Sequence, residues 1–197
     1  MAVFDSGFGG LTVLRALRAQ LPDEDFFYFA DTRYFPYGER PAEFLRERCV
    51  AIAQSLQQAG AKALVIACNT ASAVAAEAIR AAVSVPVIAL EPGVKPAAES
   101  SRNGRIGVLA TQRTLESERF QRLLGTYGQG REVFGQACTG LADAIENDGP
   151  ASARVAALLD RYVTPLAALQ VDTVVLGCTH YPWASAEIAR RLPPETR

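Results

Sequence analysis

Two cysteines in matching surroundings are the residues of this chain best suited to do chemistry. Cys68 stands in LVIACNT and Cys178 in VVLGCTH, so each follows a short apolar run and has threonine within the next two positions. His180, the only histidine, follows Cys178 by two residues. A free thiol titrates near ~8.5 and a helix N-terminus lowers that value, so either cysteine could supply a thiolate, with His180 as an acid or base. Small core cysteines and a packed core histidine are the alternatives.

The pairing of the two cysteines favours a reaction that is itself nearly symmetric. Neither belongs to a CxxC pair, and a papain-like nucleophile would leave the second cysteine unexplained. In racemisation one group removes a proton from one face of a carbon and another returns a proton to the opposite face. Lys62 and Lys95, the only lysines, lie outside any motif, so no pyridoxal Schiff base is expected. One histidine and no CxxC make a zinc site improbable, and we expect chemistry without a cofactor or metal.

A third candidate is the glycine-rich stretch DSGFGG, residues 5–10. It matches neither GxGxxG nor GxxxxGK[ST], and Asp5 at its mouth would repel phosphate. We expect its amides and the Ser6 hydroxyl to hold a small carboxylate at a helix N-terminus, and Asp5 to hold an ammonium or assist a base. A plain strand-to-helix turn with an N-cap is the alternative.

The elements that must position these residues alternate along the chain. The predicted strands are the apolar runs at 2–4, 26–30, 63–67, 85–90, 106–110 and 173–177. The segments between them carry apolar residues at a spacing of three to four, which predicts helices. Uninterrupted apolar strands are typical of a parallel sheet buried on both faces, so we predict an α/β fold with right-handed crossovers.

The chain also looks duplicated. VFDSGFGGLTV and VLATQRTLES both predict a strand, a polar turn and a helix, and each is followed by one of the two cysteine motifs. A stretch rich in Pro, Gly and Ser, 90–104, separates the halves. We predict two similar lobes, 1–92 and 93–197, with a ligand in the cleft beyond their strand ends. The residues at or just beyond such ends are Asp5, Asp31, Cys68, Cys138 and Cys178.

Composition narrows the class of partner. The 197 residues are 49% hydrophobic, and 20 Lys+Arg nearly balance 21 Asp+Glu, so charge gives no reason to expect nucleic acid or an anionic membrane. No apolar run approaches the roughly 18–20 residues that span a bilayer. The four cysteines permit two disulfides, but the chain starts without a basic leader and is rich in apolar residues, so we expect a cytoplasmic protein with reduced thiols.

Five motifs together resemble the signature blocks of the glutamate racemases. They are FDSGFGGLTVL, ADTRYFPYGE, ACNTASA, EPG and LGCTHYP, in the family's order across 1–182. The resemblance implies two flavodoxin-like lobes around a closed cleft and a cofactor-independent isomerase that supplies D-glutamate for peptidoglycan, commonly as a homodimer. An aspartate-type racemase, a decarboxylase of the same superfamily and an inactive amino-acid-binding module remain alternatives. The decarboxylases resemble a one-cysteine version, which the two cysteines here argue against.

The resemblance also implies roles for particular residues. Cys68 would be the base for D-glutamate, assisted by Asp5, and Cys178 the base for L-glutamate, assisted by His180. The implied substrate-binding residues are Asp5, Ser6, Tyr37, Gly38, Asn69, Thr70, Thr179 and His180. Glu146 would be the functional glutamate of ACTGLADAIENDG, where Thr139 and Asp143 replace the family's usual prolines. An exposed helix glutamate is the alternative for Glu146.

Family members run further beyond GCTHYP, with a tail that returns to complete the first lobe. Here 15 residues follow Pro182. We therefore expect the family's fold and site. Whether the first lobe is complete, and hence whether the chain is active, is not decided by the sequence.

Overall fold

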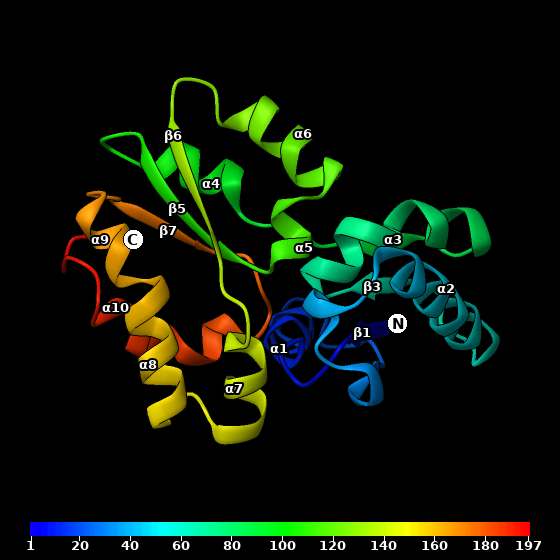
Figure 1. Cartoon of the computed structure of the whole chain (residues 1–197). Helices are drawn as coiled ribbons and strands as arrows, with labels where there is room; N and C mark the ends of the chain where they lie inside the picture. The colour runs from blue at the N-terminus through cyan, green and yellow to red at the C-terminus, as the bar shows by residue number, and fades with distance from the viewer.

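The computed structural model describes residues 1–197, and its strands form two separate parallel sheets (Figure 1). The first sheet has the order β2-β1-β3-β4. Its strands are β1 (Ala2–Asp5), β2 (Phe27–Ala30), β3 (Leu64–Ile66) and β4 (Val87–Ala89). The second sheet has the order β6-β5-β7. Its strands are β5 (Arg105–Ala110), β6 (Glu132–Ala137) and β7 (Thr173–Leu176).

Helices cover both faces of the first sheet because successive side chains of a strand point to opposite faces. Phe4 and Ile66 pack against α2 and α3, whereas Val3 and Val65 pack against α1. All four side chains are at most 2% exposed. The helices and short 3-10 turns of this half are α1 (Leu11–Gln20), η1 (Thr32–Tyr34), η2 (Tyr37–Glu39), α2 (Ala42–Gln58) and α3 (Asn69–Ala82).

The second sheet is covered in the same way. Val108 packs with α4 and α6 on one face, and Leu109 packs with α7, α8 and α10 on the other. The helices are α4 (Val94–Ser100), α5 (Gln112–Leu115), α6 (Glu118–Tyr127), α7 (Leu141–Asp148), α8 (Ala153–Tyr162), α9 (Thr164–Ala168), the 3-10 turn η3 (Tyr181–Ala184) and α10 (Ser185–Ala189). No helix is long and apolar enough to cross a membrane.

The fold class predicted from sequence is confirmed: two α/β lobes, each with a parallel sheet flanked by helices. The division between residues 92 and 93 stays a prediction. Two details differ from the sequence expectation. Strand β6 (EVFGQA) was not predicted because Glu132, Gly135 and Gln136 interrupt its apolar residues. The helical stretch 152–170 breaks into α8 and α9 beside Pro165, which has no N–H to continue the helical ladder.

Strand direction explains where the functional residues meet. In both sheets the strands are parallel, so their carboxyl ends gather at one edge. Asp5 ends β1, and Cys68 follows β3 by two residues. In the second sheet Thr111 follows β5 directly, and Cys178 follows β7 by two residues. The two edges face one another across a cavity.

Candidate active site

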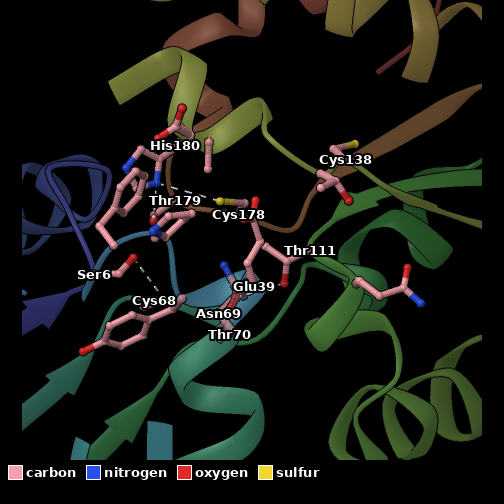
Figure 2. A pocket seen from close by; sticks show the side chains of 18 of the residues that line it. Ser6, Glu39, Cys68, Asn69, Thr70, Thr111, Cys138, Cys178, Thr179 and His180 are labelled. Carbon is pink, nitrogen blue, oxygen red and sulfur yellow. Dashed lines mark hydrogen bonds between the residues drawn. The ribbon is translucent and has the colours of Figure 1, made fainter. Parts of the chain in front are cut away.

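The cavity is lined by residues from both lobes (Figure 2). Every catalytic or substrate-binding residue implied by the resemblance lines it except Asp5 and Glu146, and of the other two strand-end residues Cys138 lines it and Asp31 does not. The implied residues on its wall are Ser6, Tyr37, Gly38, Cys68, Asn69, Thr70, Cys178, Thr179 and His180. Their assembly from segments up to 174 residues apart follows from the facing strand ends.

Cys68 is the N-cap of α3, where its sulfur accepts a hydrogen bond from the backbone N–H of Ala71 at 3.5 Å. Its thiol also lies 3.8 Å from Ser6 Oγ. Burial raises the pKa of Cys68 to about 12, and the nearby charge of Asp5 adds to that, while Ala71 and Ser6 act in the opposite direction. The expectation that the helix N-terminus lowers the pKa of this thiol is therefore wrong, because desolvation outweighs the two hydrogen bonds.

Cys178 comes from the second lobe, with its Sγ 3.9 Å from His180 Nδ1. Burial raises its pKa well above the ordinary value, the backbone hydrogen bond involving His180 lowers it, and the charges of Cys68 and Asp5 raise it further. Burial therefore disfavours the thiolate form of both sulfurs. A positively charged group of a ligand close to the reacting carbon would counteract this effect.

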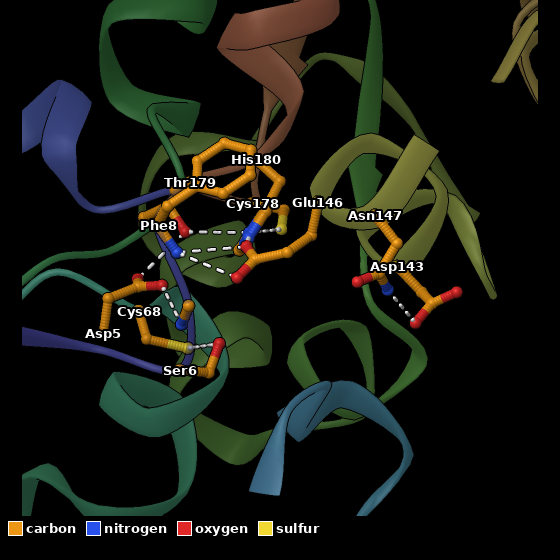
Figure 3. Close-up of polar contacts among 12 residues, drawn as sticks. Asp5, Ser6, Phe8, Cys68, Asp143, Glu146, Asn147, Cys178, Thr179 and His180 are labelled. Atoms are coloured by element: carbon orange, nitrogen blue, oxygen red, sulfur yellow. Dashed lines mark hydrogen bonds and ion pairs between the residues drawn. The ribbon is translucent and has the colours of Figure 1, made fainter. Parts of the chain in front are cut away.

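Asp5 lies behind the cavity wall and is fully buried. Its Oδ1 accepts from the Gly7 amide at 3.0 Å, and its Oδ2 accepts from the Thr179 hydroxyl at 2.9 Å (Figure 3). Burial raises the pKa of Asp5. The charge interaction with His180 and the hydrogen bonds from Gly7 and Thr179 partly offset this effect. Asp5 therefore joins the first lobe directly to the residue next to Cys178. Its predicted assistance to Cys68 stays a prediction.

Glu146 contacts the far side of the histidine rather than the cavity. Its carboxylate pairs with His180 Nε2 and accepts from the Phe8 amide at 3.0 Å (Figure 3). The rings of Phe8 and Phe35 lie 5.4 and 5.1 Å from the His180 ring. Glu146 and the two rings thus hold the imidazole in one orientation beside Cys178, an arrangement that aids proton transfer.

Two amides of the glycine-rich turn already have partners within the protein, and the predicted contact of the turn with a ligand carboxylate stays a prediction. The amides of Gly7 and Phe8 do bind carboxylates, but these are the protein's own Asp5 and Glu146. The turn also packs closely on the opposite lobe, because a Cβ on Gly9 would lie 2.5 Å from His180 Nδ1. Of this turn only Ser6 reaches the cavity.

Several wall residues were not predicted. Thr111, which caps α5, lies with its Oγ1 2.9 Å from Thr70 Oγ1 and so joins the two lobes on the other side of the cavity. The internal duplication could have predicted Thr111, since Thr111 directly follows β5 as the DSGFGG turn follows the apolar run of β1. The other wall residues outside the prediction are Phe35, Pro36, Glu39, Gln112, Thr139, Gly140, Ala142 and Asp143.

The wall contains no lysine or arginine, and its ionisable residues other than the thiols, Tyr37 and His180 are Glu39 and Asp143. A bound carboxylate would therefore meet backbone amides and hydroxyls. Asn69 Oδ1 is buried and has no hydrogen-bond partner, which leaves an acceptor for a ligand's ammonium. No three His, Cys, Asp or Glu side chains are grouped to hold a metal ion, and all four cysteines are free.

Comparison with known proteins agrees with this geometry. A model of the Asp/Glu/Hydantoin racemase family matches residues 11–195. The glutamate racemase of Pseudomonas aeruginosa PAO1 is 50% identical over 196 residues, which are 99% of this chain and 74% of that protein. The crystal structure of Escherichia coli glutamate racemase with L-glutamate and the activator UDP-MurNAc-Ala superposes with a TM-score of 0.89 at 35% identity, covering 100% of this chain and 76% of that one. The Francisella tularensis glutamate racemase with D-glutamate superposes with a TM-score of 0.84 at 31% identity, covering 97% and 72%.

The resemblance drawn from the five motifs is thereby confirmed, and the similarity extends over nearly the whole chain. The chain belongs to the Asp/Glu/Hydantoin racemase family, among its glutamate racemases.

Proposed function

We propose that this chain interconverts L- and D-glutamate by a two-base mechanism without a cofactor. The observation that carries the proposal is the pair of thiols, Cys68 from one lobe and Cys178 from the other, on the wall of a single cavity. Relatives with 50% sequence identity are glutamate racemases, and two similar crystal structures contain L- or D-glutamate. A site with one acid–base group on each side of a carbon suits inversion of that carbon.

Binding would use neutral donors for the two carboxylates and acceptors for the ammonium. Ser6 and Thr70 offer hydroxyls on the wall, and the unpartnered Asn69 Oδ1 offers an acceptor. The Thr179 hydroxyl already donates to Asp5, so Thr179 would bind a carboxylate through its backbone amide. Hydroxyls and amides that are already oriented stabilise a developing negative charge without reorganisation. The ammonium is bonded to the reacting carbon and favours the thiolate form of the thiol that acts as base, while the donors of the wall offset the charge of the two carboxylates.

In the D-to-L direction the Cys68 thiolate removes the α-proton, and the Cys178 thiol donates its proton to the opposite face of the carbanion. The product leaves Cys68 as a thiol and Cys178 as a thiolate, which is the state that the L-to-D direction requires. His180, oriented by Glu146, would exchange protons with Cys178, and Asp5 would act beside Cys68. Exclusion of water by the closed lobes strengthens these interactions.

The test is circular dichroism of the purified chain with L- or D-glutamate and no added cofactor. Loss of the signal from either enantiomer, insensitive to EDTA and without an absorbance band from pyridoxal, supports the proposal. The kcat/KM for aspartate should be at least about tenfold lower than that for glutamate, because the shorter side chain leaves the donors placed for the far carboxylate unpaired. Equal values for both amino acids would favour an aspartate-type or broader racemase, and binding without turnover would favour an inactive binding module.

Three further parts of the proposal concern the setting: supply of D-glutamate for peptidoglycan, a cytoplasmic location and assembly as a homodimer. They are supported by the family membership and by the four free thiols. Sedimentation velocity with and without glutamate measures the oligomeric state, and a monomer under both conditions would contradict the dimer.

A further inference from the structure

An ion pair stands directly behind one wall of the cavity and is not used by the proposed mechanism. Asp31 is 3% exposed and follows β2, and its two carboxylate oxygens accept from Arg48 Nε at 3.0 Å and Nη2 at 2.7 Å. Neither residue lines the cavity. The Arg48 side chain keeps 32% of its surface exposed, so solvent screens the pair and its contribution to stability is modest. The other contacts of the pair lead to the cavity.

The pair is connected to the cavity through Tyr37. The Tyr37 hydroxyl donates to Asp31 Oδ2 at 2.6 Å, while the same residue lines the cavity and is 1% exposed. Burial raises the pKa of Tyr37 far above its ordinary value, so the phenol keeps the proton that it donates. For Asp31, burial raises the pKa, but the hydrogen bonds from Arg48 and Tyr37 outweigh it and leave the pKa lowered. Asp31 is thus the charged acceptor that both partners require.

Arg48 also holds the segment that precedes Tyr37. Its guanidinium carbon lies 4.8 Å from the centre of the Tyr34 ring, in η1. The backbone of Asp31 is held beside β1, since its N–H donates to the Asp5 carbonyl at 2.9 Å. Arg48 itself is carried by α2, whose buried face belongs to the core of the first lobe. The guanidinium therefore connects a rigid helix to residues 31–37.

The far end of this segment meets the second lobe. Gly38 lines the cavity, and a Cβ on it would lie 2.7 Å from Thr111 Cγ2. A displacement of Tyr37 would therefore move the backbone of Gly38 either into Thr111 or away from the bound ligand. Placement errors of about 1 Å in such a wall cost as much as 10²-fold in activity.

We propose that Arg48 is a positioning residue: through Asp31 it fixes Tyr37 and Gly38 against the cavity and so sets the affinity for the amino-acid substrate. The inference rests on the proposed function of the same site. Tyr37 and Gly38 form no hydrogen bond with Cys68 or Cys178, so the contacts they offer are equally available to the ground state and the transition state. Loss of uniform binding of this kind raises KM and leaves kcat nearly unchanged.

The experiment compares Arg48→Gln, Tyr37→Phe, the double variant and Arg48→Lys with the wild-type chain. We expect Arg48→Gln and Tyr37→Phe each to raise KM about tenfold for both enantiomers, with kcat within about threefold. The double variant should match the weaker-binding single variant, because both changes break one chain of contacts. Arg48→Lys should recover part of the loss, since an ammonium keeps the charge without the two-pronged geometry. Arg46→Gln is the control: it is on the same helix, and its partner Glu43 is exposed.

Calorimetric titration with racemic glutamate provides a readout that is independent of turnover, because a racemic mixture undergoes no net reaction. The proposal is supported if the dissociation constant shifts with KM and if thermal unfolding shows folded variants. It is overturned if Arg48→Gln lowers kcat with KM unchanged, or if the two single effects multiply in the double variant. Where Arg48→Gln does not fold, Tyr37→Phe decides, and an unchanged KM overturns the proposal. A wild-type chain that binds glutamate without racemising it refutes the proposed function alone. The positioning role of Arg48 is then tested by comparing the dissociation constants of the variants with that of the wild-type chain. A wild-type chain that does not bind glutamate overturns both.

Discussion

Replacement of either cavity thiol should abolish racemisation yet leave half of the proton chemistry intact. In Cys178→Ala no group remains to protonate the far face of the carbanion, but Cys68 still faces the α-proton of D-glutamate. In D₂O this variant should exchange that proton with retention and leave L-glutamate unlabelled. Cys68→Ala should label L-glutamate only.

The magnitude follows from what each substitution removes. A positioned acid or base contributes about 10²–10⁴-fold in rate, so racemisation should fall to about 1% of the wild-type rate or below. Loss of one buried sulfur resembles loss of one methyl group, with a stability cost of about 1 kcal/mol, and a protein of this size then melts roughly 2–4 °C lower. Cys49→Ala is the matched control: Cys49 is fully buried in α2 but does not line the cavity. It should show the same loss of stability and keep its turnover.

The assay is the deuterium content of each enantiomer, measured by mass spectrometry after chiral separation. A single variant that still racemises at more than a few per cent of the wild-type rate would refute the two-base mechanism. Labelling of both enantiomers by both variants would show that the thiols do not face opposite sides of the substrate.

Three other outcomes are expected. Glu146→Gln should lower kcat about 10–100-fold in both directions, because the carboxylate that pairs with His180 is replaced by a neutral amide, and steady-state kinetics with an unchanged melting temperature would establish it; full activity would contradict the orienting role. Gly9→Ala should lower both melting temperature and activity, because its Cβ would lie 2.5 Å from His180 Nδ1, and a stable, active variant would show that the turn can move away. Since burial raises the pKa of Cys68 and of Cys138 to about 12 from 9.0, the unfolded chain loses these protons first as pH rises. The free energy of unfolding should therefore fall between about pH 9 and 12, with a shallower slope in Cys138→Ala, as measured by urea unfolding; equal slopes would contradict the shift.

Local sequence signals were sufficient for six of the seven strands, the fold class and the family. Short apolar runs mark these strands, and the rest of each motif follows at the strand end, where parallel topology gathers it. The two cysteine motifs could be paired from sequence because the same context occurs twice. Strand β6 escaped prediction because Glu132, Gly135 and Gln136 leave it no continuous apolar run.

Only the tertiary structure decided how the site is held together. Asp5 bonds to Thr179 from 174 positions away, and Glu146 reaches both Phe8 and His180. These contacts depend on how two separately folded lobes face each other, which no local periodicity encodes. The sequence did not show that two amides of the glycine turn bind carboxylates brought by the fold itself, and its predicted contact with a ligand, through Ser6, stays a prediction. The direction of the Cys68 pKa was also decided there: a helix N-terminus can be predicted from sequence, but the desolvation that outweighs it comes from the tertiary packing around the thiol.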